Sequence, residues 1–157
     1  MTLAPTIIER ITRARGDLRM GVPVMLVGDG MAAMVVAVEA LNAQRLADLL
    51  QIGELQLVIT ARRAETLKAR AYDGDIARIA VPGSGDVAWL RAVADPADDL
   101  RSPMKGPFLS LREGAADLHR AAIGLVKSAH LLPAALVVPV ADGLVLAAQH
   151  NLTLITL

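Results

Sequence analysis

The sequence contains no cysteine and very few aromatic residues, with one Trp, one Tyr and one Phe among 157 residues. The absence of cysteine excludes disulfide bonds, thiolate nucleophiles and cysteine-ligated zinc. The 16 basic residues are balanced by 16 acidic ones. The chain therefore offers neither the positive field nor the stacking rings that nucleic-acid binding requires, and we expect no nucleic-acid partner.

Long apolar runs are also missing. Charged residues, Pro or Gly interrupt every run before it reaches the roughly 20 residues that span a bilayer. The N-terminal segment carries Glu9, Arg10, Arg13 and Arg15 and lacks the apolar block and cleavage site of a signal peptide. We therefore expect a cytoplasmic protein with no membrane partner.

Apolar residues nevertheless make up 54% of the chain, and they are Ala, Val, Leu and Ile arranged in short periodic segments. Helices are predicted at 7–19, 43–50, 61–68, after Asp86, at 118–131 and at 144–149, with Thr6, Asn42, Thr60 and Asp86 as N-caps. Strands are predicted at 24–27, 34–38, 55–59, 76–81, 108–111, 135–140 and 152–157, and a loop at 95–106. This alternation predicts one domain over 1–157, an α/β sandwich with a mixed sheet. Because the last run ends at Leu157 without a polar tail, we expect the chain to be part of a longer polypeptide.

Two strands converge on Gly28-Asp29-Gly30, a turn with a single charged group. Asp29 is a candidate metal ligand or general base. The other interpretation is a simple turn between strands, in which Gly and Asp readily adopt positive φ values. No second acid lies nearby in the sequence, and this favours the simple turn.

Four further features are candidate binding sites. The segment Pro82-Gly83-Ser84-Gly85-Asp86 precedes a helix, as phosphate-binding loops do, but the Asp86 carboxylate would compete with an anion, so a cap is predicted. His119 and His130 are predicted on one helix, eleven residues and about 16 Å apart, too far to share a metal.

His150 is predicted at a helix end, where its positive charge suits the helix dipole. Arg62 and Arg63 lie near a predicted helix start. We predict that both are solvated and that neither clamps a substrate.

The order of several segments resembles a known family. These segments are IIERITRARGDLRMGVPVMLVGDG (7–30), MVVAVEALNAQRLADLL (34–50), LVITARRAETL (57–67), HRAAIGLVKSAHLLPAALVVPV (119–140) and AAQHNLTLITL (147–157). They resemble 3,4-dihydroxy-2-butanone 4-phosphate synthase, and still more the related N-terminal domain of some bacterial GTP cyclohydrolase II proteins. The resemblance implies a synthase-like α/β fold and a homodimer.

The same resemblance exposes what this chain lacks. The synthases carry an acidic Mg²⁺-binding loop between their first two strands, whereas residues 28–33 are shorter and hold only Asp29. With the late helix held in register, Leu118 takes the place of the metal-binding His and Arg120 the place of the Glu of the same motif, while Pro139 takes the place of a catalytic Glu. The resemblance therefore implies no catalytic residue, cofactor-binding residue, metal or other cofactor in this domain.

The leading interpretation is a catalytically silent N-terminal domain of a GTP cyclohydrolase II-like protein of riboflavin biosynthesis, with a structural, assembly or regulatory role. Its implied partners are a second copy and the C-terminal cyclohydrolase domain of the parent chain, whose Cys-ligated zinc this cysteine-free chain cannot supply. The alternative is a divergent Mg²⁺-dependent synthase acting on ribulose 5-phosphate, with Asp29 and His119 as metal ligands. A small-molecule sensor that uses the old pocket is a third possibility.

Overall fold

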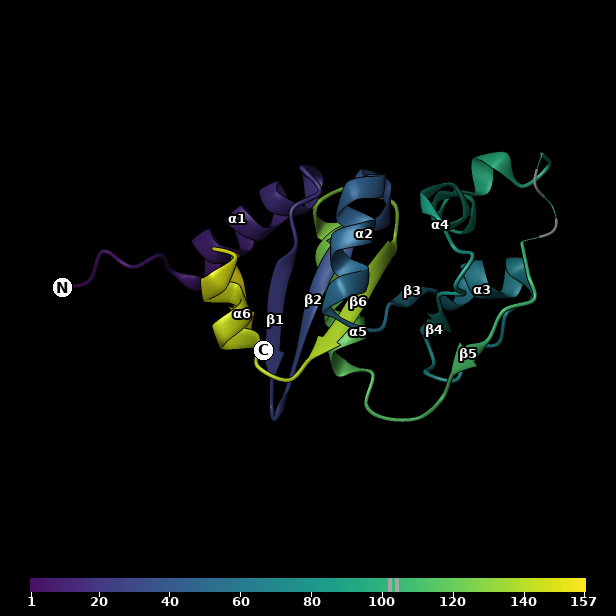
Figure 1. Ribbon diagram of the computed structural model, residues 1–157. Coiled ribbons are helices and arrows are strands. Elements are labelled where there is room, and N and C mark those ends of the chain that lie inside the picture. Colours follow the sequence, from purple (N-terminus) through teal and green to yellow (C-terminus); the bar gives the residue numbers. More distant parts are fainter. Residues whose placement is uncertain (102, 104) are drawn as a thin grey trace.

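Seven strands form one mixed sheet in the computed structural model (Figure 1), which describes residues 1–101, 103 and 105–157, without the side chain of residue 98. The strands are β1 (Val24–Gly28), β2 (Met31–Ala37), β3 (Gln56–Thr60), β4 (Ile76–Ala80), β5 (Ser110–Leu111), β6 (Ala134–Val140) and β7 (Leu154–Thr156). Their order is β5-β4-β3-β6-β2-β1-β7, with β1 and β7 parallel and the other neighbouring pairs antiparallel.

Helices cover both faces of the sheet. They are α1 (Ile7–Arg19), α2 (Ala43–Ile52), α3 (Ala61–Leu67), α4 (Val87–Ala94), α5 (Asp117–Ser128) and α6 (Gly143–Gln149). Helices α1 and α5 pack on one face through a cluster that includes Leu18 and Leu118, and the other four helices pack on the opposite face. Two separate clusters form because side chains along each strand alternate between the two faces. The predicted α/β sandwich with a mixed sheet is confirmed.

Local signals in the sequence account for the helix starts. Thr6 and Glu9 form a reciprocal capping box at α1, and the side chains of Asn42, Thr60 and Asp86 each accept a hydrogen bond from a first-turn N–H of their helix. These four predicted N-caps are confirmed. Among the described residues, no helix combines the length and the apolar character needed to cross a bilayer.

Strands β1 and β2 form a hairpin with a two-residue turn. Gly28 pairs with Met31, and Gly30 adopts φ +65°, which leaves Asp29 and Gly30 as the turn residues. Strand β2 therefore begins three residues before the predicted position 34. Ala32 and Ala33 are weak strand formers, and their pairing with β1 and β6 overrides that propensity.

Three predicted segments need correction. The helix predicted at 118–131 ends at Ser128, and His130 follows it in a left-handed conformation with φ +62°, so His119 and His130 do not share a helix. The segment 95–106 contains a short 3-10 helix, Pro96–Asp98, which Asp95 caps through the N–H of Ala97. A second 3-10 helix, Val38–Ala40, follows β2, where the strand was predicted to continue.

Candidate functional site

The hairpin turn lies beside hydrocarbon. Asp29 is exposed at its tip, and no described residue donates a hydrogen bond to its carboxylate. A Cβ atom placed on Gly28 would lie 3.5 Å from Cδ2 of Leu118 and 3.5 Å from Cγ of Met31. Leu118 is buried. The start of α5 therefore presents an apolar side chain at the turn.

His119 points to a different part of the sheet. Its ring is buried beneath α5, and Nε2 lies 2.6 Å from Oε1 of Gln56 at the start of β3. Nδ1 is buried without a hydrogen-bond partner among the described residues. Burial lowers the pKa of His119 to about 4; the positive charge of Arg78 adds to this shift and the negative charge of Asp73 opposes it.

Sheet order separates His119 from Asp29. Gln56, which holds the His119 ring, lies on β3, and Asp29 follows β1; strands β6 and β2 run between them. Three interstrand spacings amount to about 14 Å. The structure therefore does not bring these two residues onto one ion.

Arg120 and Pro139 occupy the other positions that align with family site residues. Arg120 is exposed; its Nε lies 3.0 Å from Asp75, and its Nη2 donates to the carbonyl of Asp73. The hydrogen bond from Arg120 to the Asp75 carboxylate also holds the pKa of Asp75 below its usual range. Pro139 lies in β6 opposite Ala33 and is exposed. Within the described part of the chain, no three or more His, Asp or Glu side chains gather to hold a metal ion.

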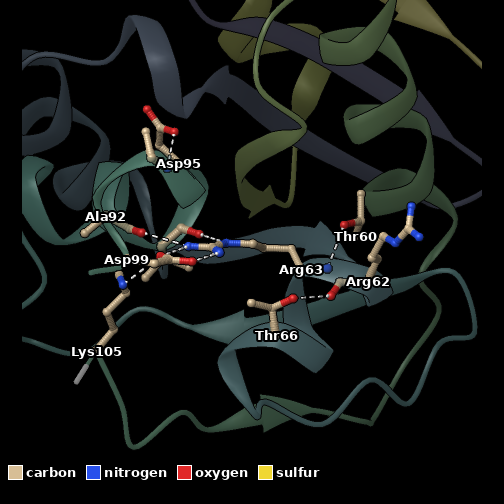
Figure 2. A network of polar contacts seen from close by, with 10 residues as sticks. Thr60, Arg62, Arg63, Thr66, Ala92, Asp95, Asp99 and Lys105 are labelled. Atoms are coloured by element: carbon tan, nitrogen blue, oxygen red, sulfur yellow. Dashed lines mark hydrogen bonds and ion pairs between the residues drawn. The ribbon is translucent and has the colours of Figure 1, made fainter. Parts of the chain in front are cut away.

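The most extensive polar network lies far from the turn, around Arg63 (Figure 2). Its Nε donates to the carbonyl of Val93 at 2.7 Å, and Nη2 donates to the carbonyl of Ala92 at 3.1 Å. Both carboxylate oxygens of Asp99 accept from its guanidinium, at 2.6 and 2.8 Å. Arg63 is buried, so the prediction that it is solvated is wrong. Arg62 is exposed and points away from the network, as predicted.

Lys105 completes this network from the loop that precedes β5. Its Nζ lies 2.9 Å from Oδ1 of Asp99, and its carbonyl accepts a bond from the indole of Trp89. Hydrogen bonds from Arg63 and Lys105 hold the pKa of Asp99 well below its usual range. The network therefore stays ionised and ties α3, α4 and the following loop together.

A pocket of about 650 Å³ adjoins this network and is lined by residues that include Asp99, Lys105 and Phe108. Of the charged residues that line it, Asp99 and Lys105 bind each other within the network, and Lys68 is an exposed residue outside it. Among the described residues, the network itself offers no free base or nucleophile. We therefore interpret the Arg63 network as a structural connection. No local sequence pattern indicates this network, because Asp99 lies 36 residues after Arg63.

The remaining candidates have structural positions. Asp86 accepts a bond from the N–H of Trp89 at 2.8 Å and caps α4, as predicted. His150 is the exposed C-cap of α6, where it was predicted to lie. His130 is also exposed.

Comparisons with known proteins agree with this fold. No known family profile matches the sequence. A GTP cyclohydrolase-2 of Azospirillum brasilense is 28% identical over 155 residues, which cover 94% of this chain and 40% of that protein. The chain thus spans about two fifths of the length of this curated relative.

Solved structures with the same fold are 3,4-dihydroxy-2-butanone 4-phosphate synthases. A cation-free synthase matches with a TM-score of 0.69 and 15% identity, over 93% of this chain and 92% of that one. A synthase in complex with two magnesium ions matches with a TM-score of 0.65 and 16% identity, over 98% and 93%. A two-domain synthase from A. baumannii matches with a TM-score of 0.65 and 17% identity, over 94% and 55%. The resemblance expected from the sequence is confirmed: the chain has the synthase fold and is similar to part of a GTP cyclohydrolase-2.

Proposed function

We propose that the chain is a catalytically silent domain of a GTP cyclohydrolase II-like protein of riboflavin biosynthesis, N-terminal in its parent chain, with a structural, assembly or regulatory role. One observation carries the proposal: where the synthase family needs metal ligands, Leu118 packs against Gly28 and leaves Asp29 as a solitary exposed carboxylate. Magnesium prefers several oxygen ligands in a polar, hydrated site. The residues at this end of the sheet do not fit that ion.

The proposed partners are a second copy of the chain and the cyclohydrolase domain of the parent protein. Homodimerisation follows from the resemblance to the synthases, and exposed apolar side chains on α6, among them Leu144 and Val145, are compatible with it. Light scattering over a range of protein concentrations tests it. A monomer at the highest concentration would argue against a role in assembly.

The alternative function is a divergent magnesium-dependent synthase. The likeness to a synthase that holds two magnesium ions and the unpartnered Nδ1 of His119 favour it. The His119 ring lies beside Gln56 of β3, away from Asp29, and this position argues against the alternative.

An activity assay separates the two proposals. The chain is incubated with ribulose 5-phosphate and Mg²⁺, and formate is measured for the wild type and for Asp29→Ala, a substitution of an exposed turn residue that should leave the fold intact. We expect the same background in both. Turnover by the wild type that disappears in Asp29→Ala would establish the synthase and reject the silent domain.

A further inference from the structure

A groove lies between helix α1 and the segment that enters β7. It has a volume of about 370 Å³ and is lined by Pro5, Arg10 and Arg13 on one side and by residues 151–154 on the other. Leu154 pairs with Met25 near the start of β1, whereas the hairpin turn follows the end of that strand. The groove is therefore at the opposite end of the sheet from the hairpin turn and the start of α5.

Two positive charges face this groove. Arg10 and Arg13 are three residues apart on α1, so they lie about 4.5 Å apart along the axis and on the same side of the helix. No described residue forms an ion pair or a hydrogen bond with either guanidinium, and no carboxylate lines the groove.

The nearest carboxylates along α1 are engaged elsewhere. Glu9 accepts a bond from the N–H of Thr6 at 2.6 Å in the capping box, and Asp17 accepts one from the hydroxyl of Thr153 at 2.6 Å. Glu9 and Asp17 are the residues four positions before and after Arg13, where helical ion pairs form. Neither carboxylate lines the groove, although the Glu9 carboxylate still interacts electrostatically with Arg13 and partly offsets its positive charge.

Arg10 also opposes the helix dipole. It is near the N-terminal end of α1, where the dipole is positive and basic side chains destabilise a helix, whereas Arg13 is at the middle of the helix. Arg10 is partly buried and Arg13 is exposed. An anion bound between them would remove this conflict.

We propose that this groove binds a small molecule through a phosphate or diphosphate group. One guanidinium group can donate two parallel hydrogen bonds to phosphate oxygens. Arg10 and Arg13 are about one helical turn apart, so both can reach one phosphate or two adjacent ones. The backbone N–H of Asn151 donates to the carbonyl of Ala148, so the further donor at the groove wall is the side-chain amide of this residue. A nucleic acid is a poorer fit, because the chain is electrically neutral and nearly free of aromatic rings. The site is independent of the function proposed above.

The test uses inorganic pyrophosphate as the probe. Binding is measured by isothermal titration calorimetry, and the groove is located by amide chemical shifts. We expect saturable binding that shifts the amides of Arg10, Arg13 and residues 151–154, and that weakens about tenfold or more in Arg10→Gln and in Arg13→Gln. Arg70→Gln is the matched control, because Arg70 is exposed and its carbonyl bonds to β5 at the other edge of the sheet.

Three results would overturn the proposal: no saturable binding at millimolar pyrophosphate, equal weakening in Arg70→Gln, or shifts confined to other parts of the chain. A single-stranded oligonucleotide that binds more tightly than pyrophosphate and depends on Arg10 and Arg13 would replace the proposal with a nucleic-acid surface. Both groove substitutions are at the surface, so unchanged melting temperatures are expected and exclude misfolding as the cause.

Discussion

At the residue scale, Arg63 shows how much one buried side chain can connect. Its guanidinium bonds to the carbonyls of Ala92 and Val93 near the end of α4 and to Asp99 in the loop that follows. Desolvating a guanidinium is costly, and these bonds offset that cost only because both oxygens of Asp99 and two carbonyls are in place. A side chain that forms only some of these hydrogen bonds would therefore not offset the cost of its own desolvation.

We expect Arg63→Met to lower the free energy of unfolding by about 2 kcal/mol or more, because two carbonyls lose a charged donor. Arg62→Met, at the exposed neighbouring position, should change it by no more than about 0.5 kcal/mol. Urea denaturation followed by circular dichroism measures both. Equal midpoints for the two variants would show that the network contributes little.

His119 makes stability depend on pH. Its pKa is about 4 in the folded chain, below the usual 6.5 of an unfolded His. Between these values the unfolded chain binds more protons, so the contribution of the neutral ring is complete above pH 6.5 and is lost as pH falls toward 4. The loss should be on the order of 2 to 3 kcal/mol.

The variant His119→Gln isolates this effect, since it keeps a polar side chain near Gln56 but has no proton to bind in this range. Its unfolding free energy should vary less between pH 6.5 and 4 than that of the wild type. Asp75 and Asp99, whose pKa values are lowered, report at more acidic pH. Parallel pH profiles for the two proteins would contradict the assignment.

Both Arg62 and Arg63 are predicted from the sequence to be solvated, and the structure shows why local signals do not distinguish the buried one from the exposed one. Both follow Thr60 in the first turn of α3, and helical propensity does not distinguish the two side chains. Only Asp99 and the carbonyls of α4 distinguish Arg63, and their proximity depends on the tertiary fold. Leu118 likewise became a candidate only through the family resemblance, because no local signal links it to Gly28.

At the element scale, close packing of α6 on the sheet depends on Gly143. A Cβ at this position would lie 2.6 Å from Cβ of Ala32 and 3.2 Å from Sδ of Met25, too close for the helix to stay in place. We expect Gly143→Ala to destabilise the chain by about 1 to 3 kcal/mol through overpacking.

Gly124→Ala is the matched control, because Gly124 lies inside α5 and nothing lies within 4 Å of the position that a Cβ would occupy. Alanine should stabilise that helix by up to about 1 kcal/mol. Denaturant midpoints should therefore move in opposite directions for the two variants. A stabilised Gly143→Ala would mean that α6 can shift away from β1 and β2 without loss.

Local patterns predicted most elements because their signals are local. The capping box of Thr6 and Glu9 and the alternation of apolar residues need no tertiary information. The order of the strands in the sheet, in contrast, cannot be predicted from local patterns. Strand β6 lies between β2 and β3 although about 75 to 100 residues separate it from them along the chain, and no periodicity encodes that pairing. The early start of β2 at Met31 is decided by the same long-range pairing.

At the scale of the whole molecule, the sheet positions the family-related residues too far apart to act together. Leu118 reaches the hairpin turn, while the next residue, His119, reaches β3. Consecutive helical residues differ by about 100° in direction, so one turn of α5 cannot present both side chains to the same place. The fold is that of the synthases, and Leu118 places buried hydrocarbon beside the hairpin turn.

This arrangement predicts how magnesium affects global stability. An ion that binds only the folded chain adds about 2.7 kcal/mol when its concentration is a hundredfold above Kd. For a chain of this size that gain raises the melting temperature by roughly 5 to 10 °C. Asp29 alone, exposed at a turn, offers one carboxylate to a strongly hydrated ion. We therefore expect the melting temperature in millimolar MgCl₂ to equal that in NaCl of the same ionic strength. A magnesium-specific rise that Asp29→Ala or His119→Gln abolishes would mean that these residues do share an ion, and the silent-domain proposal would fail with it.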